Sequence, residues 1–234
     1  MLMSPNIREE SLLAFKNNTK ENEQVVRILR DELLNDLDER ILDVGAGVGD
    51  IALGSFPNHE ATLIDRLDFS TQPIAPKHAR IQADFFDVYV EFENFHGTVI
   101  YSHVLQYLDD RYDELIKATC CINPNTIITV TNCNDGIMGK LVNWSQENIP
   151  QSNPEVVLLE FPECCGYTEI QSRQFTAHAS DVSYSNLAAL AAYLIDAPAN
   201  GYLAIIEDFL RRSLTNPCFE IAQSVKVYKR VKMK

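Results

Sequence analysis

The stretch ILDVGAGVGD, residues 41–50, decides the fold class of this chain. A short hydrophobic run ends at Asp43, and Gly45, Gly47 and Gly49 follow at alternate positions. A buried strand that runs into a glycine-rich turn and then a helix is typical of α/β proteins that hold a nucleotide. The first interpretation is therefore a nucleotide-binding turn, and the spacing of its glycines indicates the kind of nucleotide.

The glycine spacing disfavours a ligand with phosphates. A dinucleotide site needs G-x-G-x-x-G and a triphosphate site needs G-K-S/T, and this loop has neither pattern. Asp50 follows the last glycine, where an acidic side chain would repel a diphosphate. The loop suits a ligand without phosphates. S-adenosylmethionine is one such ligand, with an adenosine, a sulfonium and a zwitterionic amino-acid tail.

Short apolar segments rich in β-branched residues recur through the first half of the chain. They cover residues 40–44, 61–65, 79–84, 97–104 and 125–132. Amphipathic segments such as 109–120 lie between them, and residues 7–36 have a helical periodicity. Near-continuous apolar strands that alternate with helices predict a parallel sheet covered on both faces.

The second half of the chain departs from this alternation. Its pattern predicts a strand over 169–180, helices over 185–195 and 202–214, and a last strand over 218–231. The last segment half alternates, which is typical of an antiparallel strand added to a parallel sheet. Residues 146–168 carry three prolines and little periodicity, and we expect them to form a lid over a site.

The predicted fold is a single α/β domain over residues 1–234. We expect a Rossmann-like, doubly wound, seven-stranded sheet, mostly parallel with the last strand antiparallel, and helices on both faces. Within it we expect a helical cap over 1–37, a cofactor-binding half over 38–145 and a substrate-side half over 146–234.

Composition limits the partners. The formal net charge of −13, with no basic block except the short tail after residue 228, makes nucleic acid an unlikely substrate, although a local basic groove stays open. The first residues have no apolar core or cleavage site, so we expect no signal peptide, and the longest apolar stretch, 187–195, is too short to span a membrane. The six cysteines include no C-x-x-C, so we expect free thiols, no metal site and a cytoplasmic protein.

Four segments, in order along the chain, resemble the class I S-adenosylmethionine-dependent methyltransferases. DVGAGVG at 43–49 is similar to the first signature of this family, and Asp65 matches the acidic residue that binds the ribose hydroxyls. Asp84 matches the third signature, and residues 98–110 are similar to the fourth signature of the small-molecule branch. The likeness covers about 40–132, and the predicted last strand fits the seventh, antiparallel strand of the family.

The resemblance implies S-adenosylmethionine as the cofactor. The Asp84 carboxylate would reach the adenine amine, Phe85 would lie against the ring, and Asp43 would bind loop amides or the ligand's ammonium group. The alternative for Asp65 and Asp84 is an ordinary turn residue after a strand. The expected cofactor-binding residues are Asp43, Gly45, Ala46, Gly47, Gly49, Asp65, Arg66, Asp84, Phe85, Ser102 and His103.

The methyl acceptor is not readable from the cofactor signatures. His103 is the best candidate for a general base, because its ordinary pKa lies near neutral pH; the alternative is that it binds backbone or helps hold the cofactor. The candidate acceptor contacts are Tyr107, Trp144, Tyr167 and Arg173, with ordinary packing or surface exposure as their alternative. In related enzymes, D/N-P-P-Y/F after the fourth strand marks methylation of exocyclic or amide nitrogens, and this chain lacks that motif. Together with the acidic net charge, its absence favours a small-molecule acceptor that is modified at oxygen or nitrogen.

Other functions stay open at this stage. A methyltransferase for a peptide or protein terminus would also use a lid and an acidic surface. A catalytically inert chain of this fold would bind cofactor or a partner as a regulatory subunit. A nicotinamide oxidoreductase is disfavoured by the glycine spacing and Asp50. A homodimer is compatible with the apolar helices predicted near the C-terminus.

Overall fold

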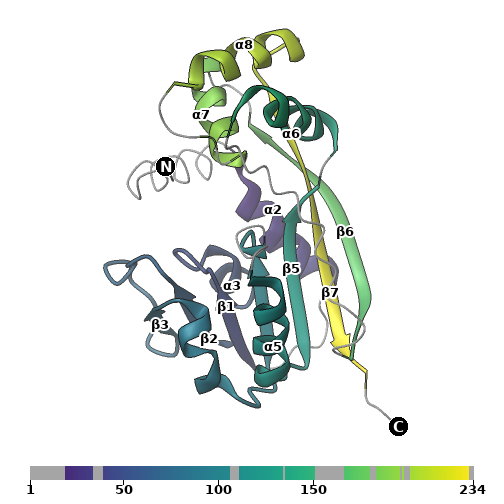
Figure 1. Cartoon of the computed structure of the whole chain (residues 1–234). Coiled ribbons are helices and arrows are strands. Elements are labelled where there is room, and N and C mark those ends of the chain that lie inside the picture. Colours follow the sequence, from purple (N-terminus) through teal and green to yellow (C-terminus); the bar gives the residue numbers. More distant parts are fainter. Residues whose placement is uncertain are drawn as a thin grey trace. The chain divides into compact units, whose positions relative to one another are not determined.

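A computed structural model describes residues 19–33, 39–105, 111–133, 135–150, 166–179, 183–195, 197 and 201–231. One sheet of seven strands runs in the order β3-β2-β1-β4-β5-β7-β6 (Figure 1). The strands are β1 Arg40–Val44, β2 Glu60–Asp65, β3 Ala79–Gln82, β4 Thr98–Ser102, β5 Thr126–Asn132, β6 Tyr167–Ala179 and β7 Phe219–Arg230.

The helices of the described residues lie between these strands and before β1. The α-helices are α2 Glu21–Arg27, α3 Asp50–Ser55, α4 Phe85–Val88, α5 Tyr112–Ile122, α6 Gly136–Asn148, α7 Tyr184–Leu194 and α8 Leu203–Ser213. A π-helix, Ile28–Leu33, continues α2, and a 3-10 helix, Tyr89–Phe92, continues α4. None of the helices that the structure describes is long and apolar enough to cross a lipid bilayer.

Strand direction confirms the predicted sheet. Neighbouring strands from β3 to β5 pair in parallel. At β7 the direction reverses, because Cys133 at the end of β5 donates to Ala222, whereas Arg230 at the end of β7 donates to Asn125 just before β5. Val231 in turn donates to Gly166, so β6 is also antiparallel to β7. The result is the predicted doubly wound sheet with an antiparallel addition.

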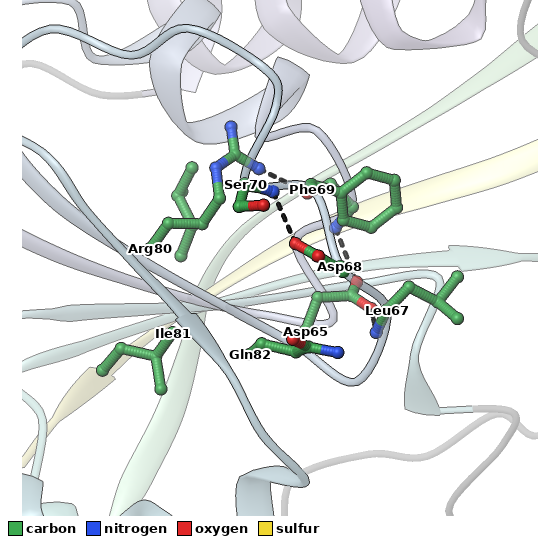
Figure 2. Close-up of a pocket in the computed structure, with 10 residues that line it drawn as sticks. Asp65, Leu67, Asp68, Phe69, Ser70, Arg80, Ile81 and Gln82 are labelled. Atoms are coloured by element: carbon green, nitrogen blue, oxygen red, sulfur yellow. Dashed lines mark hydrogen bonds between the residues drawn. The ribbon is translucent and has the colours of Figure 1, made fainter.

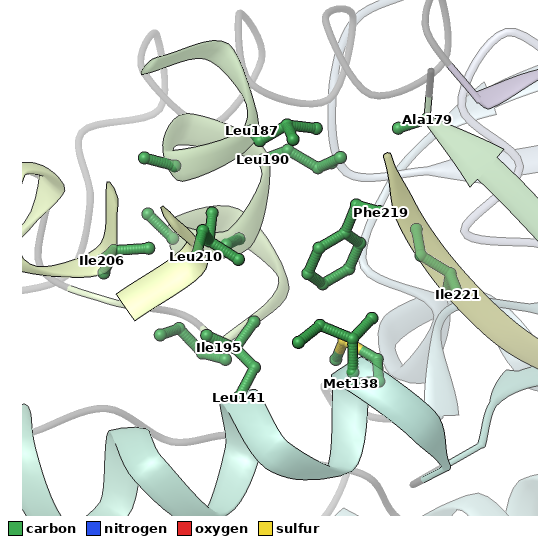
Figure 3. Packing of buried hydrophobic residues seen from close by; sticks show 14 of the residues in the cluster. Met138, Leu141, Ala179, Leu187, Leu190, Ile195, Ile206, Leu210, Phe219 and Ile221 are labelled. Atoms are coloured by element: carbon green, nitrogen blue, oxygen red, sulfur yellow. The ribbon is translucent and has the colours of Figure 1, made fainter. Parts of the chain in front are cut away.

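The chain forms two compact units. One contains most of the sheet with α3, α4 and α5; the other contains α6, α7, α8, the end of β6 and the start of β7. In the first unit, Leu42 and Tyr101 from the sheet pack against Leu115 of α5 in one buried apolar cluster. In the second unit, Phe219 and Leu141 belong to a separate apolar cluster (Figure 3).

Most predicted segments match the observed ones to within a few residues. The largest differences fall where strands end. The segment predicted over 79–84 ends as a strand at Gln82, because Asp84 is the N-cap of α4, and the segment predicted over 97–104 ends at Ser102, because His103 has a left-handed φ of 53°.

Two predicted regions lie only partly within the described residues. Of the helical cap, the structure describes residues 19–33, in which α2 and the following π-helix cover Glu21–Leu33. Of the expected lid, residues up to Asn148 belong to α6 and residues from Tyr167 belong to β6, whereas 151–165 lie outside the described residues. The short helices α3 and α4 are additions that periodicity did not predict, since four to six residues are too few to show a period.

Candidate functional site

The predicted cofactor loop follows β1, at the place where the order of strands reverses. The sheet grows from β1 toward β2 in one direction and toward β4 in the other. In doubly wound sheets, ligands bind at the carboxyl ends of the strands at such a point. The chain therefore places residues 45–49, after β1, and residues 102–104, at the end of β4, where a ligand site is expected.

The three loop glycines all have left-handed backbone angles. The φ values of Gly45, Gly47 and Gly49 are 69°, 56° and 88°, which residues with a side chain adopt only with strain. A Cβ atom on Gly45 would lie 2.8 Å from Cγ2 of Val104, and one on Gly49 would lie 2.6 Å from Cδ1 of Leu63. Packing inside the protein therefore requires glycine at positions 45 and 49, whether or not a ligand binds the loop.

Asp65 closes the loop from the end of β2. Its Oδ2 accepts the N–H of Gly47 at 2.7 Å, and its Oδ1 accepts the N–H of Leu67 at 2.8 Å. A carboxylate offers about four lone-pair sites, so each oxygen retains capacity for a further donor. The side chain is half-buried, and a diol at this point would find an acceptor that the loop itself holds in position.

Asp84 begins α4 and lies in a cluster of charges. Its Oδ1 accepts the N–H of Phe86 at 3.0 Å, and its Oδ2 lies 3.4 Å from Nη1 of Arg111 and 3.8 Å from Nε of Arg66. These two contacts are long for hydrogen bonds, so Oδ2 can still accept a donor from a ligand. Arg66, predicted to contact the cofactor, therefore lies near Asp84.

Arg111 ties this cluster to α5. Its guanidinium lies 3.7 Å from the centre of the Phe86 ring, and its Nε donates to Glu114 at 2.7 Å. The hydrogen bond from Arg111 lowers the pKa of the Glu114 carboxyl below its ordinary value. Sequence reasoning missed Arg111, because a single arginine near the start of a helix carries no pattern.

Phe85 is a core residue. Its side chain is 6% exposed, and its ring meets those of Phe86 and Tyr101 at centroid distances of 5.4 and 6.2 Å. Tyr101 is also fully buried; burial raises the pKa of its hydroxyl, which hydrogen-bonds to Thr119 at 3.0 Å. The Tyr101 side chain is therefore directed toward α5.

Ser102 and His103 form the end of β4 beside the glycine loop. The N–H of His103 donates to the carbonyl oxygen of Val130 at 2.9 Å, which continues the pairing of β4 with β5. Both side chains are partly exposed, whereas Asp43, at the end of β1, is 1% exposed. A non-glycine residue with a left-handed φ at this edge, as in His103, is the kind of strained conformation that clusters at functional sites.

A cavity of about 170 Å³ opens beside Asp65, between the glycine loop and the ends of β2 and β3 (Figure 2). The residues that line it are Gly47, Leu63, Asp65, Leu67, Asp68, Phe69, Ser70, Arg80, Ile81 and Gln82. Leu67 is 42% exposed, a large apolar side chain in a position open to a ligand. The sequence signal that could have revealed Leu67 and Phe69 is their place directly after the acidic strand end.

Hydrogen bonds fix two polar residues of this cavity. Asp68 accepts the N–H of Ser70 at 2.8 Å, and hydrogen bonds from Ser70 lower the pKa of the Asp68 carboxyl. Arg80, on β3, donates to the carbonyl oxygens of Gly47 and Val48 at 3.0 and 3.1 Å. Arg80 is a second residue that sequence reasoning missed, because nothing in a strand's pattern reveals which loop its side chain reaches.

Of the four candidate acceptor contacts, Tyr167 and Arg173 lie in the same compact unit as this cluster, and each makes a contact elsewhere in that unit. The Tyr167 hydroxyl donates to the carbonyl oxygen of Pro124 at 2.7 Å inside the core, at the end of the sheet opposite the glycine loop. Arg173 pairs with Glu32 at 3.1 Å on the surface. Trp144 belongs to the other compact unit, and Tyr107 lies outside the described residues.

Trp144 packs within its own unit. Its ring stacks on that of Phe209 with a centroid distance of 4.6 Å and an angle of 22°. Both side chains are partly buried at the edge of the apolar cluster that contains Leu141 and Phe219. Packing explains this contact without a ligand.

Comparison with known proteins identifies the fold. No family model matches the sequence, and neither does any curated protein. Among solved structures, the YcgJ protein from Bacillus subtilis is 13% identical with a TM-score of 0.58, and covers 90% of this chain and 100% of its own. A cyclopropane-fatty-acyl-phospholipid synthase-like protein from Lactobacillus casei is 12% identical with a TM-score of 0.55, and the match covers 98% of this chain and 95% of that protein.

A candidate type II methyltransferase from Anaeromyxobacter dehalogenans is 15% identical with a TM-score of 0.52, and covers 88% of this chain and 95% of its own. At these identities the likeness concerns the fold. The chain has the Rossmann-like fold of class I S-adenosylmethionine-dependent methyltransferases, with strand order 3-2-1-4-5-7-6.

Proposed function

We propose that this protein is an S-adenosylmethionine-dependent methyltransferase that acts on an oxygen or nitrogen of a small molecule. The observation that supports this most strongly is the hydrogen bond from the Gly47 amide to the Asp65 carboxylate, at the carboxyl end of the sheet. It joins the glycine loop and the acidic strand end, two segments that sequence resemblance assigns to one ligand, in a fold that methyltransferases share.

The residues present fit this cofactor. Asp65 has free acceptor capacity for the ribose hydroxyls, and Asp84, 24% exposed, for the adenine amine. Leu67 and Phe69 offer apolar surface beside Asp65 in the cavity of Figure 2. Arg66 and Arg111 each lie within 4 Å of Asp84.

When bound, S-adenosylmethionine supplies a methyl group on a positively charged sulfur. The protein's own residues then have to orient the cofactor and the acceptor and exclude water. His103 is the candidate for taking up the acceptor's proton, since it leaves β4 beside the glycine loop with a partly exposed side chain. Tyr107, Trp144, Tyr167 and Arg173 remain proposals as acceptor contacts, and packing accounts for Tyr167 and Trp144.

Two features of the sequence, its net charge and a missing motif, support the proposal of a small-molecule acceptor. A net charge of −13 opposes a nucleic-acid substrate, and the amide-nitrogen signature is missing after β4. We place the protein in the cytoplasm because the cysteines that the structure describes, at 120, 121, 133 and 218, are free thiols.

A coupled assay tests this function. The purified protein is incubated with S-adenosylmethionine and separate pools of small phenols, alcohols, carboxylic acids, amines and short peptides, and S-adenosylhomocysteine release is measured by mass spectrometry. We expect release that depends on one acceptor class. Release only with peptides would transfer the proposal to a terminus methyltransferase, and cofactor binding with no release for any acceptor would favour an inert, regulatory chain.

A further inference from the structure

Arg80 reaches from β3 to the glycine loop across more than thirty residues of sequence (Figure 2). Nη1 donates to the carbonyl oxygen of Gly47 at 3.0 Å, and Nη2 donates to that of Val48 at 3.1 Å. The planar guanidinium thus binds two successive carbonyls, a geometry that a lysine ammonium cannot reproduce. Both bonds are charge-assisted, and such bonds are stronger than those between neutral groups.

Hydrogen bonds account for every polar group but one in the peptide units from Ala46 to Gly49. The Gly49 N–H donates to the Ala46 carbonyl oxygen at 2.9 Å, and the Gly47 N–H donates to Asp65. The other two carbonyls are the ones that the guanidinium binds. Among the residues that the structure describes, the Val48 N–H has no acceptor.

The geometry of the peptide bond links this N–H to Arg80. The Gly47 carbonyl and the Val48 N–H belong to one planar trans peptide unit, so they point in opposite directions. By holding the carbonyl, Arg80 turns the Val48 N–H away from β3. A cationic donor on the carbonyl also polarises the peptide unit and makes its N–H a stronger donor.

We propose that Arg80 is a positioning residue for the cofactor: it fixes the Gly47–Val48 peptide unit so that the Val48 N–H is presented to an acceptor atom of the bound ligand. This inference rests on the proposed function, because only a ligand in the glycine loop would use that amide. It also explains why an arginine is tolerated next to a site for a cationic sulfonium. Its charge is directed at loop carbonyls, not at the ligand.

The test uses S-adenosylhomocysteine as the probe and Arg80→Met as the variant. We expect about a tenfold or greater loss of affinity by calorimetry, which is the size expected for a misplaced hydrogen bond in the site. Arg40→Met is the matched control. Arg40 also donates to a backbone carbonyl, that of Phe95, and lies 4.6 Å from the centre of the Phe95 ring, at the other end of the sheet. We expect the control to keep wild-type affinity.

A spectroscopic measurement separates positioning from general stabilisation. In ¹⁵N-labelled wild-type protein, the Val48 amide resonance should move on addition of S-adenosylhomocysteine, and this response should be lost in Arg80→Met. Arg80→Lys keeps the positive charge but cannot bind both carbonyls at once, so it should lose less affinity for S-adenosylhomocysteine than Arg80→Met. If Arg80→Met does not fold, the affinity of Arg80→Lys is the test, and wild-type affinity in that variant would overturn the inference.

Three results would overturn the inference. They are wild-type affinity for S-adenosylhomocysteine in a folded Arg80 variant, an equal loss of affinity in Arg40→Met, or a wild-type Val48 amide resonance that does not move when S-adenosylhomocysteine is added. Failure of the wild type itself to bind S-adenosylhomocysteine is a separate result, which removes the proposed function and the role of Arg80 with it.

Discussion

Asp65 holds two backbone amides with one carboxylate. It anchors the glycine loop through the Gly47 N–H and its own turn through the Leu67 N–H, and each oxygen retains capacity for a further donor. Sequence identified Asp65 by its place after a strand. Only the structure shows that Asp65 also holds the glycine loop, the segment that we propose binds the same ligand.

Replacement of Asp65 should therefore weaken cofactor binding. We expect Asp65→Ala to reduce the affinity for S-adenosylmethionine by about 1–3 kcal/mol, the cost of leaving hydroxyls and a loop amide without their acceptor. Calorimetry measures this directly. Asp208→Ala, which removes an exposed carboxylate that pairs with Arg212 on α8, is the control and should bind normally. Unchanged affinity in Asp65→Ala would show that the ribose contact is wrongly assigned.

His103 is testable by a substitution that respects its backbone. Asparagine tolerates a left-handed φ better than alanine, so His103→Asn removes the imidazole with little added strain. If His103 is the base, turnover with an identified acceptor should fall by about a hundredfold or more, while affinity for S-adenosylhomocysteine stays near that of the wild type. His178→Asn, an exposed histidine on β6, is the control. Full activity of His103→Asn across the pH range would exclude the role.

At the scale of elements, the loop after β1 is shaped by the packing of its neighbours as much as by a ligand. Gly45 has a left-handed φ and faces Val104, in the segment that carries His103. This contact couples the end of β1 to the end of β4. The glycine pattern is thus partly a requirement of the fold, which the sequence alone could not separate from a ligand requirement.

Because Gly45 and Val104 are in contact, we expect the effects of Gly45→Ala and Val104→Ala on the free energy of unfolding to be non-additive. Gly45→Ala should lower the free energy of unfolding by about 1–3 kcal/mol, through backbone strain and the 2.8 Å approach to Val104. In a Val104→Ala background the same change should cost less, because the approaching methyl group is gone. Urea denaturation of the four proteins measures both values. Strict additivity would mean that strain at Gly45, and not contact with Val104, sets the cost.

His78, in the turn before β3, links this strand to β2. Its Nδ1 accepts the N–H of Ala61 at 3.2 Å, which requires a neutral ring. Desolvation, and then the charge of Lys77, lowers the pKa of the imidazole below its ordinary value of 6.5. The folded state therefore binds a proton less readily than the unfolded state does.

The sign of the pH effect follows from this. The contribution of His78 to stability is complete above the ordinary pKa and is lost as pH falls below it toward the lowered value. Between about pH 7.5 and pH 5, the wild type should lose more stability in urea than His78→Asn, whose amide oxygen accepts the same N–H without titrating. Equal losses in the two proteins would mean that the Ala61 contact does not govern the titration.

At the scale of the whole molecule, two buried clusters share two strands. Tyr167 and Tyr228 belong to the cluster of the first unit, whereas Ala179 and Phe219, at the other ends of the same strands, belong to the cluster of the second unit. The long strands β6 and β7 therefore contribute to both cores. The sequence pattern predicts the two strands, but it does not reveal that the two ends of each strand pack into different apolar clusters.

Much of the fold was readable from sequence because it depends on local patterns. Buried strands such as 40–44 and the alternation near 218–231 predicted the class of sheet that the structure has. The rest depends on contacts between distant residues. The reach of Arg80 to Gly47, the burial of Phe85 and the packing of Trp144 on Phe209 leave no periodic trace. Each of these features became visible only with the tertiary structure.

We propose that the glycine loop and Asp65 together bind S-adenosylmethionine. Calorimetric titration of the purified protein with S-adenosylmethionine and S-adenosylhomocysteine, with NAD and ATP as controls, measures this binding. We expect saturable binding of the first two ligands at one site and no binding of the controls. Binding of NAD, or of neither adenosyl ligand, would contradict it.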